Sequence, residues 1–383
     1  MRADSRLAVP IVLIAAVMVG RGSEAAVAEA PIVGAISSVP TPVRSVPLPM
    51  RVVGRGVLGG TRRAPVFRRQ WPGTYFETAF RGRAAMFVVG PGDVDLRVVV
   101  DDRPLGDLVR PTPGFYRVGR LAPGRHRLRV EIVSESQSGA TDFGGFFAAG
   151  VTRPEVLPAR SRQIEFVGDS HTVGYGNTSP TQTCDDAQVW RTTDTALGIA
   201  GIAGRRYGAD YRVDAISGRG VVRNYAGGPG ATIPEAYPFT LFDQAQRDRS
   251  PEWQPQAIVV ALGTNDFSTP LHAGEKWSTR TTLHADYEAT YLRFLQTLRE
   301  RNPAARIVLW ATDLAEGEIA DEEERVVRQM RDAGDSRVDF VRVPGLSFSA
   351  CHHHPSVADD RRIVDAVGDV LDADAGLWQR PRP

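Results

Sequence analysis

The chain has 383 residues, of which 42% are hydrophobic, and its 46 Lys and Arg residues nearly balance 45 Asp and Glu residues, leaving a formal charge of +1. This length accommodates about two domains with buried cores. The near-neutral charge shows no sign of the concentrated basic excess that a nucleic-acid surface needs, so we expect a globular protein with no nucleic-acid partner.

The amino terminus has the pattern of an export signal. Arg2 and Arg6 precede an apolar run over residues 7–20, and small residues follow at 26–28. This pattern predicts a signal peptide over residues 1–28, cleaved after Ala28. A membrane anchor is the alternative, but the run falls short of the roughly 20 residues that a bilayer helix needs. We therefore expect a mature protein that is secreted or periplasmic, with no membrane partner.

The first half of the mature chain predicts a β-rich domain. Residues 29–50 are rich in Pro, Val and Ser, and we expect them to form a linker. Residues 51–156 contain alternating or continuous apolar segments separated by Pro-Gly pairs, with no helical periodicity. The predicted strands are 76–80, 85–89, 96–100, 114–118 and 126–133. We expect a β-sandwich of jelly-roll type.

From residue 159 to residue 383 the pattern changes to alternating strands and helices. Continuous apolar runs such as 257–262 favour a parallel sheet that is covered on both faces. Helical spacing of apolar residues occurs at 287–298 and again at 363–371. The predicted strands are 163–167, 211–216, 257–262, 306–311 and 337–343. The second domain is therefore predicted to be a three-layer α/β unit.

Three loops that follow strands of this predicted sheet carry candidate catalytic residues. Ser170 follows the first strand, Gly218 follows the second, and Asn265 follows the third. The carboxyl ends of parallel strands share one edge, where ligands bind in open α/β sheets. Ser170 is the candidate nucleophile, and the N–H groups of Ser170 and Gly218 and the amide of Asn265 are candidate oxyanion donors.

A serine nucleophile needs a base, and His354 is the best candidate among seven histidines. His126, His272 and His284 are expected to be solvated, and His171 is adjacent to Ser170 in a turn, where neighbouring side chains diverge. His354 belongs to a run of three histidines before Pro355 and a predicted helix. We assign it as the general base.

The two cysteines, Cys184 and Cys351, are expected to form a disulfide, because an exported protein folds in an oxidising compartment. In the chain-entropy treatment, a bridge closing so long a loop stabilises the fold by about 5 kcal/mol. Cys184 follows Ser170, and Cys351 lies three residues before His354. The bridge would therefore tether the nucleophile segment to the base segment.

The blocks Gly168-Asp169-Ser170, Gly218, Asn265-Asp266 and His354-Pro355 resemble, in order and spacing, those of the SGNH (GDSL-like) hydrolase superfamily. More narrowly, residues 168–177, 217–224 and 351–355 resemble carbohydrate esterase family 2. The resemblance implies a jelly roll joined to an SGNH domain, hydrolysis of acetyl esters on plant-type polysaccharides such as xylan, mannan or glucan, and no cofactor.

One departure from the superfamily pattern concerns the histidine. In the superfamily an aspartate commonly stands three residues before the histidine, and in this chain that position is Cys351. Relatives in the narrower family often have aspartate two residues before it, where this chain has His352. Loss of the orienting carboxylate can be costly in a triad. We predict a Ser–His dyad whose imidazole is oriented by a backbone carbonyl, with Asp313 or Asp359 as alternative orienting acids.

Three other readings compete with hydrolysis. The first is a metal site formed by His171 and two of the residues 352–354, but the sequence has no ligand spacing of the kind found in known metal sites to support it. A carbohydrate-binding protein with a decayed site is favoured by the missing aspartate but opposed by retention of Ser170, Asn265 and His354. Acyl transfer to a sugar hydroxyl would use the same acyl-enzyme. We expect a monomer acting on acetylated polysaccharide or oligosaccharide.

Overall fold

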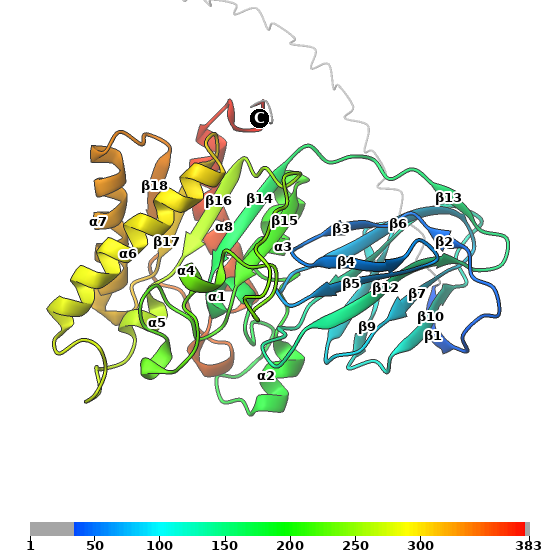
Figure 1. Ribbon diagram of the computed structural model, residues 1–383, viewed down its shortest axis with the longest axis horizontal. Helices are drawn as coiled ribbons and strands as arrows, with labels where there is room; N and C mark the ends of the chain where they lie inside the picture. The colour runs from blue at the N-terminus through cyan, green and yellow to red at the C-terminus, as the bar shows by residue number, and fades with distance from the viewer. Residues whose placement is uncertain (1–33, 380–383) are drawn as a thin grey trace, which may run out of the picture. The chain divides into compact units, whose positions relative to one another are not determined.

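The structure is a computed structural model that describes residues 34–379, so the predicted signal peptide and its cleavage point lie outside the described residues. Two antiparallel sheets come first in the chain, and a parallel sheet flanked by helices follows (Figure 1). Among residues 34–379 no helix combines the length and apolar character needed to cross a membrane. The predicted β-sandwich and three-layer α/β unit are both confirmed.

The sandwich consists of one sheet in the order β1-β10-β7-β12-β5-β4, with β2 paired to β12, and a second in the order β13-β6-β11-β8-β9, with β3 paired to β6. The strands are β1 Ala35–Val39, β2 Pro47–Leu48, β3 Arg51–Val53, β4 Val57–Thr61, β5 Ala64–Arg69, β6 Tyr75–Gly82, β7 Ala85–Val89, β8 Asp95–Val100, β9 Arg103–Val109, β10 Gly114–Gly119, β11 Gly124–Ile132, β12 Thr141–Ala148 and β13 Arg153–Glu155.

Alternation of side chains places the apolar residues of these strands between the two sheets. In β11, Leu128 and Val130 are fully buried, as a strand with one core-facing side requires. Phe76 of one sheet stacks on Phe143 of the other, with ring centroids 3.9 Å apart. Aromatic residues from both sheets therefore form the centre of the sandwich core.

The amino-terminal segment expected to be a linker contains strands instead. β1 pairs with β10, and β2 pairs with β12, so both belong to the first sheet. Their sequences are short and carry no clear alternation, and β1 is only partly buried. Pairing with a distant strand creates these elements, which explains why local pattern did not predict them.

The second unit is a five-stranded parallel sheet in the order β15-β14-β16-β17-β18. Its strands are β14 Gln163–Gly168, β15 Asp210–Ala215, β16 Ala257–Ala261, β17 Arg306–Ala311 and β18 Val338–Arg342. Its α-helices are α1 Ser170–Val173, α2 Asp186–Thr192, α3 Ile199–Tyr207, α4 Ile233–Ala236, α5 Thr264–Phe267, α6 Arg280–Arg301, α7 Glu318–Asp332 and α8 Val357–Ala373. Short 3₁₀ helices are η1 Tyr225–Gly227, η2 Ala315–Gly317, η3 Cys351–His353 and η4 Leu377–Gln379.

Helices cover both faces of this sheet, as the continuous apolar strands require (Figure 1). Apolar residues of α4, α6 and α7 pack on one face with Val167, Ile258 and Val260. Residues of α3 and α8 pack on the other face with Phe166 and Val259. Alternate residues of β14 and β16 thus belong to different cores, so both strands are buried on both faces of the sheet.

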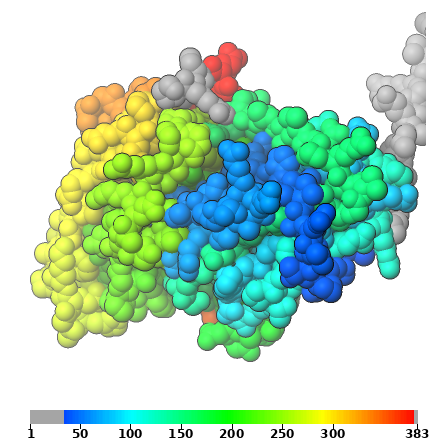
Figure 2. Space-filling view, turned by 45° about the vertical axis from the view of Figure 1, so that its right-hand side comes forward, coloured from blue at the N-terminus to red at the C-terminus, as the bar shows by residue number. Residues whose placement is uncertain are grey.

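The sandwich packs directly against the α/β unit (Figure 2). Arg55 donates a hydrogen bond to the carbonyl oxygen of Tyr237. The indole N–H of Trp71 donates to the carbonyl oxygen of Phe239 at 3.2 Å. Both side chains are almost fully buried. These sandwich residues therefore belong to a shared interior and not to a free surface.

Candidate active site

Ser170 lies where β14 ends and α1 begins, at the carboxyl edge of the parallel sheet. Asp169 caps α1, and its carboxylate accepts the backbone N–H of His171 at 3.0 Å. Ser170 is the first residue of α1 and is 5% exposed. The cap and the strand end hold the serine at the edge where the loops after β15 and β16 also arrive.

His354 is in hydrogen-bond contact with Ser170. Its Nε2 lies 2.9 Å from Ser170 Oγ. Its Nδ1 lies 2.9 Å from the carbonyl oxygen of Cys351 and 3.2 Å from that of His352. A carbonyl only accepts, so Nδ1 carries the proton and Nε2 is left to accept from the serine hydroxyl. Burial lowers the pKa of His354 to about 4, which keeps the imidazole neutral at physiological pH.

The two acids considered as alternative orienting groups are engaged elsewhere. The Asp359 carboxylate accepts from the backbone and hydroxyl of Ser347 and caps α8 through Ser356. The Asp313 carboxylate accepts the N–H of Gly345 at 3.1 Å. The contacts of His354 Nδ1 are therefore with backbone carbonyls and not with either acid.

The two backbone N–H groups predicted to bind an oxyanion belong to Ser170 and Gly218. Within the described residues, the N–H groups of Ser170 and Gly218 donate to no protein acceptor. Gly218 has φ +81°, a conformation that residues with a Cβ rarely adopt, and a Cβ placed there would have no atom within 4 Å. Backbone N–H groups without a protein acceptor are available to bind a developing oxyanion.

Asn265 lies on the third loop, at the start of α5. Its Nδ2 donates to Asp169 Oδ2 at 3.1 Å and to the carbonyl oxygen of Arg219 at 2.9 Å. The amide thus joins the nucleophile turn to the Gly218 loop. Both N–H groups of the Asn265 amide already have acceptors, so an oxyanion would share one of these N–H groups with its present acceptor.

Two buried carboxyl groups support these loops. Burial, together with the nearby Asp266, raises the pKa of Asp169 to about 7. Burial also raises the pKa of Asp266 to about 6, although its carboxylate accepts the N–H groups of Val221, Val222 and Arg223, each at 2.9 Å. Asp266 therefore holds the carboxyl-terminal half of the Gly218 loop.

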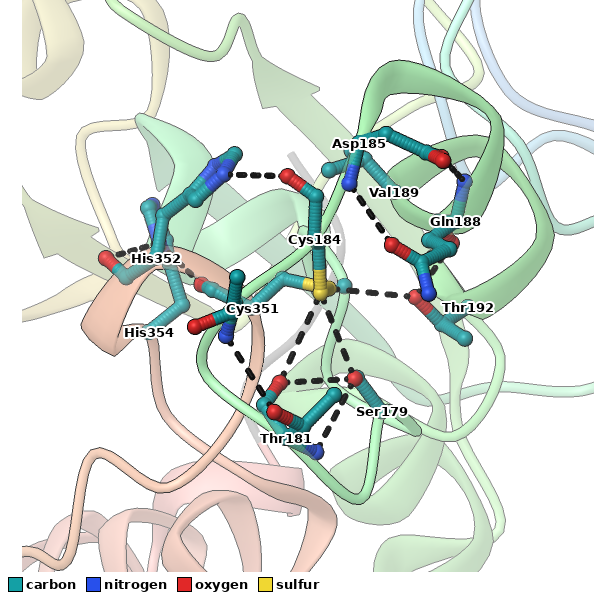
Figure 3. The surroundings of a disulfide bond; sticks show 12 residues. Ser179, Thr181, Cys184, Asp185, Gln188, Val189, Thr192, Cys351, His352 and His354 are labelled. Carbon is teal, nitrogen blue, oxygen red and sulfur yellow. Dashed lines mark hydrogen bonds between the residues drawn. A yellow bond between two sulfur atoms is a disulfide. The ribbon is translucent and has the colours of Figure 1, made fainter.

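The predicted disulfide is present, and it joins Cys184 to Cys351 across 167 residues with a Cα–Cα distance of 5.5 Å (Figure 3). His352 strengthens the same connection, because its N–H donates to Gln182 O at 2.7 Å and its Nε2 donates to Cys184 O at 2.9 Å. Cys351 also supplies one of the carbonyls that orient His354. The disulfide is thus next to the orienting group.

The remaining histidines are engaged in different ways. His171 is buried beside Trp310 and the edge of the His354 ring, and burial lowers its pKa to about 3. His126 and His284 were expected to be solvated, but each lies within 2.9 Å of a carboxylate, and His126 is only 8% exposed. Residues 34–379 contain no group of three or more His, Cys, Asp or Glu residues placed to hold a metal ion.

Two sets of residues near the site were missed by sequence reasoning. The ring of Tyr175 lies 4.4 Å from that of His354, and its hydroxyl lies 3.1 Å from His352 Nδ1. Tyr175 belongs to the block 168–177, so its proximity to Ser170 in the chain was an available signal. Glu135 and Gln137 reach the Gly218 loop from the sandwich, and no local pattern marks them.

Both halves of the chain match known protein families. Residues 53–158 match the carbohydrate esterase 2 N-terminal domain, and residues 166–370 match the GDSL-like lipase/acylhydrolase family. An acetylxylan esterase / glucomannan deacetylase of Cellvibrio japonicus is 40% identical over 334 residues, which cover 87% of this chain and 93% of that protein. This chain belongs to carbohydrate esterase family 2.

Solved structures of family 2 esterases share the two-part fold. A carbohydrate esterase whose active site is described as having divergent catalytic and non-catalytic binding functions superposes with a TM-score of 0.82 at 38% identity, over 87% of this esterase and 100% of that chain. A family two esterase from Clostridium thermocellum, solved in complex with cellohexaose, gives a TM-score of 0.76 at 26% identity, over 85% and 100% of the two chains.

Proposed function

We propose that this esterase removes O-acetyl groups from plant-type polysaccharides, namely xylan, mannan or glucan, with Ser170 as nucleophile and His354 as base. The observation that carries the assignment is the 2.9 Å contact between Ser170 Oγ and His354 Nε2, in a site where Nδ1 is fixed by backbone carbonyls. The substrate class is supported by the 40% identical relative, an acetylxylan esterase / glucomannan deacetylase.

In the first half-reaction, Ser170 Oγ attacks the acetyl carbonyl carbon while His354 Nε2 takes the hydroxyl proton. The carbonyl oxygen becomes an oxyanion, which the N–H groups of Ser170 and Gly218 and the amide of Asn265 stabilise. Collapse of the intermediate breaks the ester bond, and His354 gives its proton to the departing sugar oxygen. The sugar leaves with a free hydroxyl group, and the acetyl group stays on Ser170.

In the second half-reaction, a water molecule attacks the acetyl-enzyme. His354 Nε2 accepts a proton from the water, and collapse of the second oxyanion breaks the bond to Ser170 Oγ. His354 gives that proton to Ser170 Oγ, and acetic acid leaves and ionises to acetate. Throughout, the carbonyls of Cys351 and His352 keep the Nδ1 proton in place, which is the orienting part of a triad carboxylate's role.

The site of action belongs to the same proposal. The Cys184–Cys351 disulfide is of the kind that persists in oxidising compartments. Together with the signal pattern over residues 1–28, it supports a secreted or periplasmic enzyme that meets its polysaccharide outside the cytoplasm.

Substitution of the nucleophile tests the assignment. Ser170→Ala removes the attacking oxygen. The rate of acetate release from acetylated xylan or 4-nitrophenyl acetate should therefore fall by at least ~10³-fold, as it does when a residue of a serine catalytic triad is removed. The free energy of unfolding should not change. His354→Ala should have nearly the same effect. His353→Ala, which changes an exposed neighbour, is the matched control and should be mild. Full activity of Ser170→Ala would disprove the proposal.

A further inference from the structure

A loop of the sandwich, residues 133–139, lies against the Gly218 loop and is held rigidly by its own domain. The Ser134 hydroxyl accepts the backbone N–H of Asp95 at 2.8 Å, and the Ser136 hydroxyl accepts from Arg69 at 2.9 Å. Both serines are 1% exposed. Because Ser134 and Ser136 are anchored in the sandwich, Glu135 between them is directed at the α/β unit.

Both backbone groups of Ser217 are bound by this sandwich loop. The Ser217 N–H donates to Glu135 Oε1 at 2.8 Å. The Ser217 carbonyl oxygen accepts from Gln137 Nε2 at 3.1 Å. Gln137 Nε2 also donates to Glu135 Oε1 at 3.1 Å, so the carboxylate orients the amide. The three groups form one hydrogen-bonded unit across the domain boundary.

The carbonyl that Gln137 binds belongs to the same peptide unit as the N–H of Gly218. A trans peptide is planar, and its C=O and N–H point in opposite directions. Fixing the Ser217 oxygen therefore fixes the direction of the Gly218 N–H. Donation to the carbonyl also polarises the peptide and strengthens its N–H as a donor.

This peptide needs such support because Gly218 offers little resistance to rotation. Gly218 has φ +81° and no side chain, and a Cβ there would touch nothing within 4 Å. On its carboxyl side the loop is held, since Gly218 O accepts the N–H of Tyr225 at 2.9 Å and Arg219 O accepts from Asn265 at 2.9 Å. On its amino side, Glu135 and Gln137 hold the backbone of Ser217.

We propose that Glu135 and Gln137 are positioning residues that orient the Gly218 N–H toward the oxyanion, so that the sandwich domain completes the active site of the α/β domain. The inference rests on the proposed function, because it assigns Gly218 to the oxyanion. It also gives the amino-terminal domain a role in the chemical step, separate from any part in binding polysaccharide.

Substitutions of Gln137 and Glu135 test the inference. Loss of a whole oxyanion donor costs ~10²–10³-fold in kcat, so Gln137→Ala, which only loosens one, should lower kcat about tenfold with little change in KM. Gln137→Glu places a carboxylate against the Ser217 carbonyl and should lower kcat further than Gln137→Ala does.

Glu135→Ala should also lower kcat, because the Ser217 N–H loses its acceptor. Glu135→Gln keeps a side-chain oxygen that accepts this N–H, so its kcat should stay close to that of the wild type. Ser138→Ala, on the same loop, is the matched control and should leave kcat unchanged.

The decisive readout compares 4-nitrophenyl acetate with its thionoacetate analogue, whose sulfur is a poor hydrogen-bond acceptor. Impaired positioning should reduce the oxygen-ester rate more than the thionoester rate, with active-site titration and the thermal unfolding midpoint unchanged. Equal losses on both esters, a change confined to KM, or wild-type kcat in Gln137→Ala would overturn the inference. The proposed function is tested separately by Ser170→Ala, because the outcome for that variant does not depend on Glu135 or Gln137.

Discussion

At the scale of single residues, the site pairs Ser170 with a histidine that backbone carbonyls orient. A carbonyl dipole fixes the tautomer but supplies less charge than a carboxylate to stabilise the imidazolium. Burial of His354 also favours its neutral form. The base is therefore well oriented and weakly basic, which has a direct consequence for the pH dependence of activity.

The acid limb of the pH profile should lie lower than that of an enzyme whose histidine has its usual pKa. Only neutral His354 accepts the serine proton, and its pKa is lowered to about 4. We expect kcat/KM, measured as acetate release, to be level from neutrality to about pH 5 and to fall about tenfold per pH unit below about pH 4. Intrinsic fluorescence over the same range is the control for unfolding. A fall centred near pH 6.5 would contradict this prediction.

Asp169 should matter through Asn265 and not through the bulk fold. In Asp169→Asn, one side-chain oxygen still accepts the His171 N–H, but an amide then faces the Asn265 amide in place of a carboxylate oxygen. Displacing Asn265 removes one oxyanion donor, so kcat should fall by ~10²-fold. Asn265→Ala is the companion variant, and the double variant should be little worse than either single one. Additive losses would show that the two residues act independently.

At the scale of elements, the base is held by η3, a single turn whose neighbours are tied to residues 181–184. The disulfide, the His352 contacts and the Gln182 side-chain bond to Phe348 O all connect these segments. Gly176 permits their close approach, because its φ is +56° and a Cβ there would lie 2.4 Å from Cys351 Cβ. The segment around Cys184 and the segment that carries His354 are therefore joined at one place, around the disulfide (Figure 3).

Removing the disulfide should weaken both stability and catalysis. In Cys184→Ser combined with Cys351→Ser, the free energy of unfolding should fall by about 2–5 kcal/mol, measured with denaturant. The kcat should also fall, because the Cys351 carbonyl that orients His354 becomes mobile. Reduction of the wild-type enzyme is the matching control and should reproduce both effects. Unchanged kcat after reduction would show that η3 keeps its shape without the bridge.

At the scale of the whole molecule, a buried ionic cluster joins the two domains. Arg55 of the sandwich lies 3.0 Å from Asp214 and 3.5 Å from Asp248 of the α/β unit, and its guanidinium is fully buried. Buried charges of this kind are costly to leave unpaired. The domains are therefore coupled energetically as well as by contact.

Loss of this arginine should destabilise the whole enzyme. Arg55→Ala removes the cation from beside the buried carboxyl groups of Asp214, Asp248 and Glu165 and should lower the free energy of unfolding by about 3–5 kcal/mol. Arg81→Ala, which breaks the exposed pair with Glu155 on the sandwich, is the control and should cost under about 1 kcal/mol. Denaturant unfolding followed by fluorescence measures both. If Arg55→Ala lowered the free energy of unfolding as little as Arg81→Ala does, the two domains would not be coupled through Arg55.

Sequence pattern predicted the elements whose burial is strong and regular. All five parallel strands lie within a few residues of their expected positions. The central strands β16 and β17 are the clearest, because they read as nearly continuous apolar runs. In the sandwich, β6, β7, β8, β10 and β11 were predicted, whereas β1 to β5, β9, β12 and β13 were not. Edge strands such as β4 and β9 are largely exposed, and Gly144 and Gly145 interrupt the pattern of β12. Such strands are defined by their partners.

The sequence by itself determined the two-domain plan and the candidate residues Ser170, Gly218, Asn265 and His354, because residue type and position after a strand are local properties. The tertiary structure decided what orients His354 and what holds Gly218. Those roles fall to the carbonyl of Cys351 and to the side chain of Gln137. Every residue has a carbonyl, and surface glutamines are common, so only their placement by the fold distinguishes these two.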